Sequence, residues 1–532
     1  MDEVDEKWIL LIFHPGYDAA MPKYQDMGAS SVGDAARISK RLIIDELNIA
    51  EGEFRWCWDL VAACLDLGLT QDDGSKIRDF QLRLFDALAR LEDIHHSLRA
   101  EEKRLIARKL SLSEAWFAAR MKTLAKYREA VLHGVAIGRA IGDAFAWFFY
   151  QFDRELIEEH RAHQRQPFLP MGIGRAGERA VIKEMQGQNG RLLIHHGTTT
   201  FLRMGDISYI DLPRMRVASV GEVKARRHGD HLKVSVNLVS SREDMLPQIP
   251  EDAVIVDRLD MSRAVADKLA RQSDLMAKAI ENSQKTKARR LIEAEMRYHY
   301  SAVPELVAKS NCRQFEFVKL GAPAVLGSVK LPRRSFGGRI FGDGTDMHRA
   351  SESVPHWALQ IMVDNCDYNA LRICKIAGDP KGLEQHFEQP PFLHWPIDTR
   401  TKEAILFARV ALVALYNPAH FWRALEERGF ELSWRSDGRE LLDAVRRDGD
   451  QAFHFQSADW FHHLMSHEMM DLELVLEMLD TFFEQAGELG SDVEPGKPRK
   501  IEIYPRFGLV RPMGSGDEVT VAVADRENSA VA

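Results

Sequence analysis

The chain has 532 residues, enough for roughly three or four domains, and its hydrophobic content of 45% and charged content of 28% describe an ordinary soluble protein. The net charge of −9 excludes a bulk cationic field that would draw the protein onto nucleic acid or a membrane, so any contact with a polyanion must come from local basic patches. The number of cysteines, five, is odd and none forms a CxxC pair, so neither a disulfide framework nor a structural zinc site is indicated, and a reducing cytoplasm fits best. The acidic start, MDEVDEKW, lacks the basic residues and apolar run of a signal peptide.

The N-terminal part of the chain is expected to be mainly helical. Residues 7–13 read as a short strand, and a helical pattern extends from about 34 to 165. Ser111 and Glu114 have the spacing of a capping box, which predicts that a long helix starts there. We therefore assign residues 1–165 to an N-terminal, mainly helical domain.

Two segments of this helical region carry further information. Residues 131–152 are apolar, with a glycine at every fourth position, but His133, Arg139 and Asp143 interrupt them. A charge at the centre of a bilayer costs about 2.5 kcal/mol or more, so this segment is interpreted as a buried helix of a soluble bundle, with no membrane partner. The stretch 99–128 is rich in Lys and Arg, which is typical either of a solvated helix face or of a surface that follows phosphates.

The middle of the chain has the pattern of an α/β core. A Pro/Gly break, QPFLPMGIG at 166–174, marks a domain boundary and is followed by a helix at 175–186. Another helical stretch is expected at about 261–299. Between the two helices lie four strand-like runs, at 191–196, 200–212, 216–225 and 231–241. Residues 166–300 are therefore predicted to form one domain with a sheet and flanking helices.

The C-terminal half shows no internal repeat. Residues 312–331 look like strands, 330–346 have the composition of a flexible loop, and 401–488 have a helical pattern. The domains predicted from these patterns are a mixed strand and loop region at 301–395, a C-terminal helical region at 396–495 and a tail at 496–532 that is disordered at its end.

Charged residues interrupt the two strands on either side of a tight turn at 213–215. A register centred on this turn pairs Asp211 with Val217 and Asp206 with Glu222, and the alternation of side chains places Lys224 on the same face as Glu222. Carboxylates directly opposite each other repel, and burying them costs several kcal/mol per uncompensated ion. Mg²⁺ binds one or two carboxylates and keeps waters for phosphate oxygens, so the pattern predicts a site for Mg²⁺ or Mn²⁺.

The helix before these strands carries a third acid. Glu178 shares a stripe with Val181, Ile182 and Met185, at spacings that place all four side chains on one face. Glu178 is therefore expected to face the sheet, whereas Glu184 is expected to face water. An acid on the packing face of a helix is a second anomaly that indicates the same site.

An acid on a helix, an Asp in one strand and Glu-x-Lys in the next resemble the PD-(D/E)xK nuclease superfamily, which has the restriction-endonuclease-like fold. The resemblance covers roughly residues 170–245, and it implies a mixed sheet core with flanking helices and Mg²⁺-dependent hydrolysis of phosphodiester bonds. Two features depart from the family pattern. Gly205 stands where the family name has Pro, and the chain runs from Glu-x-Lys into another strand with no helix between.

The resemblance also implies roles for individual residues. Asp206 and Glu222 would bind the metal, together with the main-chain carbonyl of Val223. Lys224 would orient the attacking water, and Glu178 matches the helix acid, which would contribute to the metal site and to catalysis. Basic residues near the site and in the later loop would bind nucleic acid: Arg226, Arg227, Lys233, Arg333, Arg334 and Arg339.

The function expected from these residues is a metal-dependent endonuclease. Nuclease modules joined to unfamiliar helical domains resemble bacterial defence or restriction effectors, which implies foreign DNA as the substrate and partner contacts or homo-oligomers through the helical domains. Two alternatives stay open at this point. One is a non-catalytic interaction or regulatory protein with the same fold, and the other is an RNase, because the acids and the lysine do not distinguish DNA from RNA.

Overall fold

The structure is a computed structural model of a mixed α/β chain, in which two compact units are described separately. The first unit comprises residues 1–286, 334–341 and 383–394, and the second comprises 287–333, 342–382 and 395–532. The structure describes residues 5–13, 38–67, 74–150, 156–157, 159–160, 163, 168–185, 191–212, 216–228, 231–240, 254–255, 263–284, 298–310, 315–321, 324–331, 333–341, 354–363, 372–377, 392–436, 440–448, 451–455, 460–466 and 469–490.

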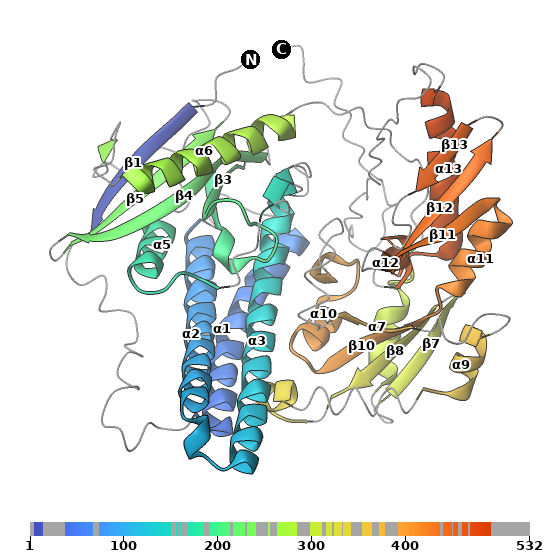
Figure 1. Ribbon diagram of the computed structural model, residues 1–532, viewed down its shortest axis with the longest axis horizontal. Helices are drawn as coiled ribbons and strands as arrows, with labels where there is room; N and C mark the ends of the chain where they lie inside the picture. The colour runs from blue at the N-terminus through green and yellow to red at the C-terminus, as the bar shows by residue number, and fades with distance from the viewer. Residues whose placement is uncertain are drawn as a thin grey trace. The chain divides into compact units, whose positions relative to one another are not determined.

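Three long helices form a bundle in the first unit (Figure 1). They are α1 (Lys40–Leu67), α2 (Gly74–Ala107) and α3 (Glu114–Tyr150), and a short 3-10 turn at Lys109–Ser111 joins α2 to α3. Their sequences are rich in Ala, Leu, Arg and Glu, which are strong helix formers. The predicted helical region is therefore confirmed, and the strand expected at 7–13 is present as β1 (Asp5–Phe13).

The cap of α3 differs from the predicted capping box. The main-chain N–H of Trp116 donates to Ser113 Oγ at 3.3 Å, so Ser113, and not Ser111, accepts at the helix start. Ser111 is engaged in the preceding turn, because its hydroxyl donates to the carbonyl of Arg108 at 2.8 Å. The start of α3 at Glu114 agrees with the prediction within the usual uncertainty of a helix boundary.

The second half of α3 is buried within the first unit. Glycine allows close approach there: a Cβ at Gly138 would lie 2.6 Å from the Phe54 ring, and a Cβ at Gly142 would lie 2.1 Å from the carbonyl oxygen of Thr198. The charge on Arg139 is paired with Glu92 of α2, with 3.1 Å between Nη2 and Oε1. Within the described ranges, no helix has the length and apolar character that a membrane crossing requires.

A six-stranded antiparallel sheet packs with this bundle. Its order is β2-β3-β4-β5-β1-β6, and every pairing that the structure describes is antiparallel, whereas the resemblance implied a mixed sheet. The reason is that β2 to β5 follow one another along the chain as a meander of short connections. The strands other than β1 are β2 (Arg191–His195), β3 (Ile207–Asp211), β4 (Arg216–His228), β5 (His231–Ser240) and β6 (Val254–Ile255).

The register of β3 and β4 agrees with the prediction at the end that carries the acids. Ile207 pairs with Gly221, which brings Asp206, just before β3, level with Glu222. An irregularity between Tyr209 and Ile210 shifts the register towards the turn, so Asp211 pairs with Arg216 instead of Val217. The strand expected over 200–212 is also shorter, because it is regular only from Ile207 onward.

Helices cover both faces of this sheet. In α5 (Ile173–Glu184), a Cβ at Gly177 would lie 2.3 Å from the Cβ of Ala225, so α5 packs directly on β4. On the other side, Ser273 of α6 (Arg263–Gln284) accepts a hydrogen bond from the Asn237 side chain of β5. Asn237 pairs with Glu222, which is three residues from Ala225, so α5 and α6 lie on opposite faces.

The predicted boundary between residues 165 and 166 falls inside the first unit. Strand β1 pairs with β5 and β6, which places the N-terminal segment within the sheet. The bundle is also bonded to the sheet and to α5. Gln81 of α2 accepts from the main-chain N–H of His195 at 2.8 Å, and Arg179 of α5 donates to Asp86 of α2 through two hydrogen bonds of 2.8 and 2.9 Å. Residues 1–165 and 166–286 therefore form one compact unit.

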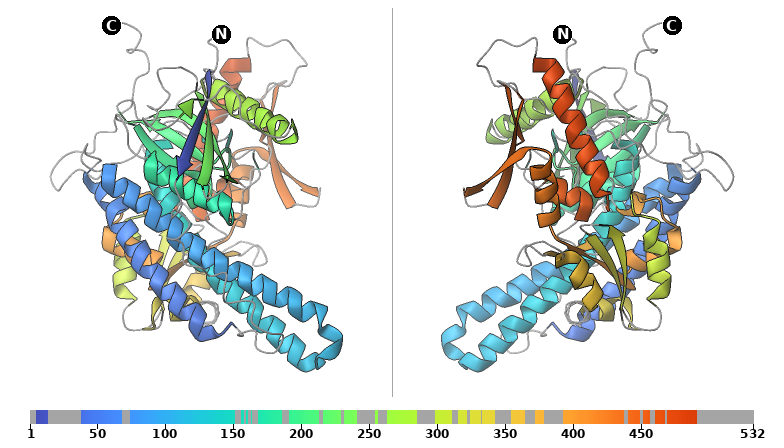
Figure 2. Two further views of the ribbon diagram at one scale, coloured as in Figure 1. Left: turned by 90° about the vertical axis from the view of Figure 1, so that its left-hand side faces the viewer. Right: turned by 90° about the vertical axis from the view of Figure 1, so that its right-hand side faces the viewer.

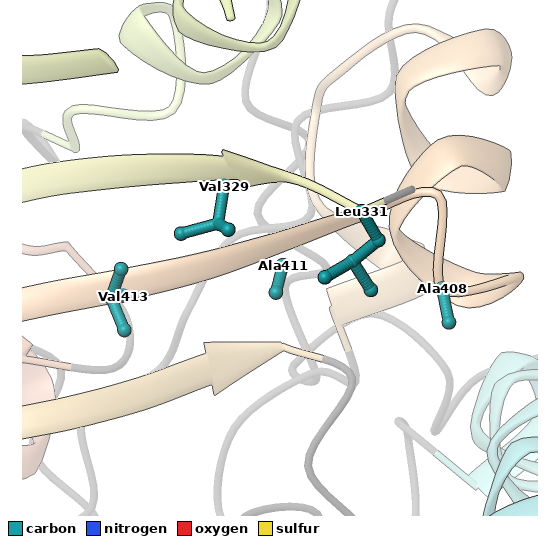
Figure 3. Close-up of a cluster of buried hydrophobic side chains, with 5 residues drawn as sticks. All are labelled: Val329, Leu331, Ala408, Ala411 and Val413. Atoms are coloured by element: carbon teal, nitrogen blue, oxygen red, sulfur yellow. The ribbon is translucent and has the colours of Figure 1, made fainter. Parts of the chain in front are cut away.

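The second unit contains two further antiparallel sheets, which corrects the expectation of a helical region at 401–488. Strand β10 lies between β8 and β9, and its sequence VALVALY is buried throughout, as suits a central strand. An apolar cluster on β8, β10 and the chain next to their ends includes Val329, Leu331, Ala408, Ala411 and Val413 (Figure 3). The strands are β7 (Phe315–Gly321), β8 (Ala324–Lys330), β9 (Arg372–Ala377), β10 (Val410–Tyr416), β11 (Phe430–Ser436), β12 (Glu440–Asp448) and β13 (Gln451–Phe455).

The helices of the second unit are short, apart from the last. They are α7 (Ala302–Lys309), α9 (His356–Val363), α10 (Thr399–Leu406), α11 (Ala419–Glu427), α12 (Trp460–Ser466) and α13 (Leu472–Gly490). The predicted loop at 330–346 is helical over 336–341, a segment that belongs to the first unit, where the N–H of Gly337 donates to Asn48 Oδ1 of α1 at 2.9 Å. Residues 342–346 and the tail at 496–532 lie outside the described residues.

Candidate active site of the first unit

The carboxylate of Asp206 is held against strand β4. The N–H of Asp206 donates to the carbonyl of Gly221 at 2.7 Å, and Asp206 Oδ2 accepts from the N–H of Val223 at the same distance. The preceding residue, Gly205, has a φ of +70°, and a Cβ there would lie 2.6 Å from the Gly221 carbonyl oxygen. Glycine at 205 therefore allows the close, left-handed approach that places Asp206 on β4.

Glu222 projects from β4 on the face covered by α6. Its side chain is only 5% exposed, and its Oε1 accepts from the Lys224 ammonium and from Gln272 Nε2 of α6, the latter at 2.9 Å. Lys224 Nζ also lies 3.3 Å from the carbonyl oxygen of Val223. The Lys224 side chain is 39% exposed, so it lies between the buried Glu222 carboxylate and the solvent.

Glu178 enters the site region from α5 and is buried, as predicted from its stripe. Val181, Ile182 and Met185 of the same stripe are buried too, and Glu184 is exposed. Glu178 Oε2 lies 2.8 Å from Nε2 of His195, which is itself fully buried at the end of β2.

Three carboxyl groups share this region with one ammonium. Burial raises the pKa of Asp206, and the charges of Glu222 and Glu178 raise it further. Burial also raises the pKa of Glu178, to about 8. Burial alone would lower the pKa of Lys224, but the neighbouring carboxylates, Glu222 first, outweigh it and raise the pKa above its usual value. Lys224 is therefore a cation at neutral pH.

The donor set is suited to a hard divalent cation. Asp206, Glu222 and the carbonyl of Val223 supply only oxygen atoms, which Mg²⁺ and Mn²⁺ prefer. The carboxyl groups outnumber the ammonium, and their raised pKa values mean that they retain protons that a bound cation would displace. In the part of the chain that the structure describes, no three His, Cys, Asp or Glu side chains are already arranged as a metal-binding group. A metal bound through Glu222 Oε1 would compete with the Lys224 ammonium, which bonds to the same oxygen.

A basic strip continues from the site along β4 and β5. Residues 222, 224 and 226 alternate onto one face of β4, and Lys233 of β5 is directly opposite Arg226. Arg227 is exposed like Arg226 and points to the other face. Two basic side chains, Arg226 and Lys233, therefore meet across this strand pair.

The three arginines predicted in the later loop are divided between the two units. Arg333 belongs to the second unit, whereas Arg334 and Arg339 belong to the first. Arg339 Nη2 lies 3.7 Å from Glu51 Oε1 of α1, and its side chain is only 12% exposed. Arg334 and Arg333 are exposed. The helical turn at 336–341, packed on α1, is the reason that this segment differs from a free basic loop.

Two polar partners of the acids were not recognised as site residues in the sequence. Gln272 lies on the same face of α6 as the buried residues Met276 and Ala279, at spacings of four and seven. A polar residue on this apolar stripe was the feature of the sequence that could have indicated its role. His195 ends strand β2, and its contact with Glu178 reveals its place at the site. Both residues act on acids that are distant in sequence.

Comparisons with known proteins add no relative. No family model, no curated protein and no solved structure matches the chain. The resemblance to PD-(D/E)xK nucleases therefore depends on the residues and the geometry described above.

Proposed function

We propose that the first unit is a metal-dependent nuclease of the PD-(D/E)xK type, with a restriction-endonuclease-like core. The observation that carries the proposal is the convergence of Asp206, Glu222 and Lys224 at one end of the β3–β4 hairpin, with Glu178 on the helix that packs on it. These groups come from three separate elements, and they place more acid than base in a buried region. A structural role alone gives no reason for this excess.

The roles follow from the position of each group. Asp206 and Glu222, with the Val223 carbonyl, would hold Mg²⁺ or Mn²⁺, which supplies a more acidic bound water and neutralises charge on the phosphate. Lys224 stays protonated at neutral pH, so it donates to the attacking water or to a phosphate oxygen and does not act as the general base. Glu178 lies on α5 with a raised pKa and contacts His195, so it would carry a proton at neutral pH and would add negative charge beside the metal only when that proton is released.

The proposed substrate is DNA, positioned by phosphate contacts along the basic strip. Arg226 and Lys233 lie on the strands that carry the site, and Arg227 lies beside them. Phosphate contacts of this kind fix the position of a nucleic acid without reading its sequence. A role in bacterial defence against foreign DNA is the corresponding biological proposal, and it depends on analogy with nucleases joined to helical domains.

One observation favours a second candidate, a nucleic-acid-binding unit without catalysis. The Lys224 ammonium bonds to Glu222 directly, and the described residues hold no ready-made group of metal ligands. If this ion pair persists in the presence of metal, the unit keeps the basic strip without the chemistry. Cleavage of RNA instead of DNA is a further outcome, because contacts to the 2′-hydroxyl distinguish the two.

The deciding experiment is cleavage of plasmid DNA and of RNA in Mg²⁺, in Mn²⁺ and in EDTA. The expected result is cleavage of DNA with either metal and none in EDTA. The Lys224→Ala variant should lose cleavage, and Lys278→Ala, an exposed lysine of α6, is the matched control that should keep it. Absence of cleavage by the wild-type protein on both substrates, with metal bound, would contradict the nuclease proposal.

A further inference from the structure

The far end of the α2–α3 hairpin projects beyond the sheet of the first unit, as Figure 2 shows for the blue and cyan helices. The turn at Lys109–Ser111 forms this end, and none of its residues is buried. Ile106 is 57% exposed and Leu110 is 102% exposed. The hairpin end is therefore a surface that the bundle does not use for its own packing.

The acids near this end are already neutralised within the bundle. Glu101 of α2 accepts from Arg120 Nε of α3 at 2.9 Å. Glu102 accepts from Arg128 of α3 at 2.7 Å and from Arg99 of its own helix at 3.0 Å. Both glutamates are buried, so their charges do not face the solvent.

The remaining cations are exposed and outnumber the exposed acids. Between residues 103 and 126, Glu114 is the only acidic residue outside these pairs. Six basic residues in that interval are exposed, and the described residues offer them no salt bridge: Lys103, Arg104, Arg108, Lys109, Lys122 and Lys126. A concentration of positive charge of this size contrasts with the net charge of −9 of the whole chain.

We propose that this end of the hairpin, residues 103–126, binds the phosphate backbone of a nucleic acid duplex. Lys122 and Lys126 are four residues apart on α3 and form a stripe along that helix, whereas Lys103 and Arg104 lie at the end of α2 and Arg108 and Lys109 follow directly in the connecting turn. From the start of α3 to Lys126 the rise is about 18 Å, at about 1.5 Å per residue. That length corresponds to about five base pairs of a duplex, which presents about one charge per 1.7 Å.

The length of the charged region favours a duplex over a membrane. An anionic membrane surface would contact the tip, where Ile106 and Leu110 are exposed, but Lys126 is set back from the tip along α3. A rod-shaped polyanion lying along α3 would follow the stripe of Lys122 and Lys126 toward the basic turn. The choice of a nucleic acid over an acidic protein rests on the proposed nuclease function, whereas the anion-binding character of the surface does not.

The test is equilibrium binding of a fluorescent 30-base-pair duplex in EDTA, which prevents cleavage, over a range of salt concentrations. The variant carries Lys103→Gln, Arg104→Gln, Arg108→Gln and Lys109→Gln, and a second variant carries Lys122→Gln and Lys126→Gln. The control carries Lys76→Gln and Arg78→Gln at the opposite end of α2. Helix content and melting temperature, measured by circular dichroism, should be unchanged because all these side chains are on the surface.

The first variant should bind about tenfold more weakly or worse. The negative slope of log affinity against log salt should become less steep by about 3 to 4 in the first variant and by about 2 in the second. An unchanged duplex affinity and slope in both variants would overturn the proposal. So would an equal loss in the control, or a loss of binding to phosphatidylserine vesicles with duplex binding intact. Because binding is measured without metal, failure of the nuclease function alone would leave these results unaffected.

Discussion

Nε2 of His195 lies 2.8 Å from Oε2 of Glu178, and this contact joins the acid of α5 to the end of strand β2. Burial lowers the pKa of His195 to about 4 and raises that of Glu178 to about 8. Near neutral pH, neither group is therefore favoured in its charged form. Both groups are then neutral, and the carboxyl proton lies in the hydrogen bond between Glu178 and His195. An acid is therefore buried beside Asp206 without a full negative charge.

The first prediction concerns the pH dependence of stability in metal-free protein. The pKa of Glu178 is raised from 4.5 to about 8 on folding, so its contribution is fully present below pH 4.5 and is lost as pH rises through about 8. The contribution of Glu178 to the free energy of unfolding should fall by about 5 kcal/mol at most over this interval, and the net fall should be seen above pH 6.5, where the opposing contribution of His195 is complete. Denaturant unfolding in EDTA between pH 5 and 9 measures it. Glu178→Gln should flatten the dependence, and Glu184→Gln, an exposed residue of the same helix, should not.

His195 contributes with the opposite sign at lower pH. Its pKa is depressed, so its contribution is present above the unfolded value of 6.5 and is lost as pH falls towards about 4. His195→Ala should remove this dependence and destabilise the protein by about 2 to 4 kcal/mol, because it leaves a cavity and a buried carboxyl group without its partner. A variant as stable as the wild type at pH 7 would show that the contact has no structural weight.

The third prediction separates charge from hydrogen bonding at Asp206. Asp206→Asn keeps an oxygen that accepts from the Val223 N–H but removes a charge that Glu222 and Glu178 oppose. In EDTA at pH 8, the variant should be as stable as the wild type or more stable. It should lose binding of Mn²⁺ and reduce DNA cleavage by about a hundredfold or more. Thermal melts, metal titration and cleavage on one preparation test all three, and full cleavage by the variant would exclude Asp206 from the site.

The sequence predicted the local geometry of the site better than its surroundings. The alternation of side chains and the short turn placed Asp206 level with Glu222, and the apolar stripe of α5 placed Glu178 on the packing face. The irregularity at Tyr209 and Ile210 could not be predicted, because it depends on how the meander twists. Local patterns therefore located the acids to within one element.

Contacts between distant segments account for the parts that the sequence did not predict. Strand β1 joins the sheet beside β5, more than two hundred residues later, so the expected boundary at 165 does not separate two units. Gln272 reaches Glu222 from α6. The apolar run of β10 fits either a buried helix or a central strand, and only pairing with β8 and β9 decides between them.

The last prediction tests whether Lys224 has a role beyond the ion pair. Lys224→Met keeps an apolar stem of similar length but leaves Glu222 buried with Gln272 as its one remaining donor among the described residues. At pH 7 in EDTA the variant should be less stable by about 1 to 3 kcal/mol, because a buried carboxylate loses its partner. Metal should restore much of that loss, since the cation replaces the ammonium beside Glu222.

If the unit is a nuclease, Lys224→Met should bind Mn²⁺ at least as tightly as the wild type and yet fail to cleave DNA. If Lys224 only neutralises Glu222, metal binding and cleavage should both be retained. Calorimetric titration with Mn²⁺ and a plasmid cleavage assay on this variant, with Lys278→Met as the control, distinguish the two cases.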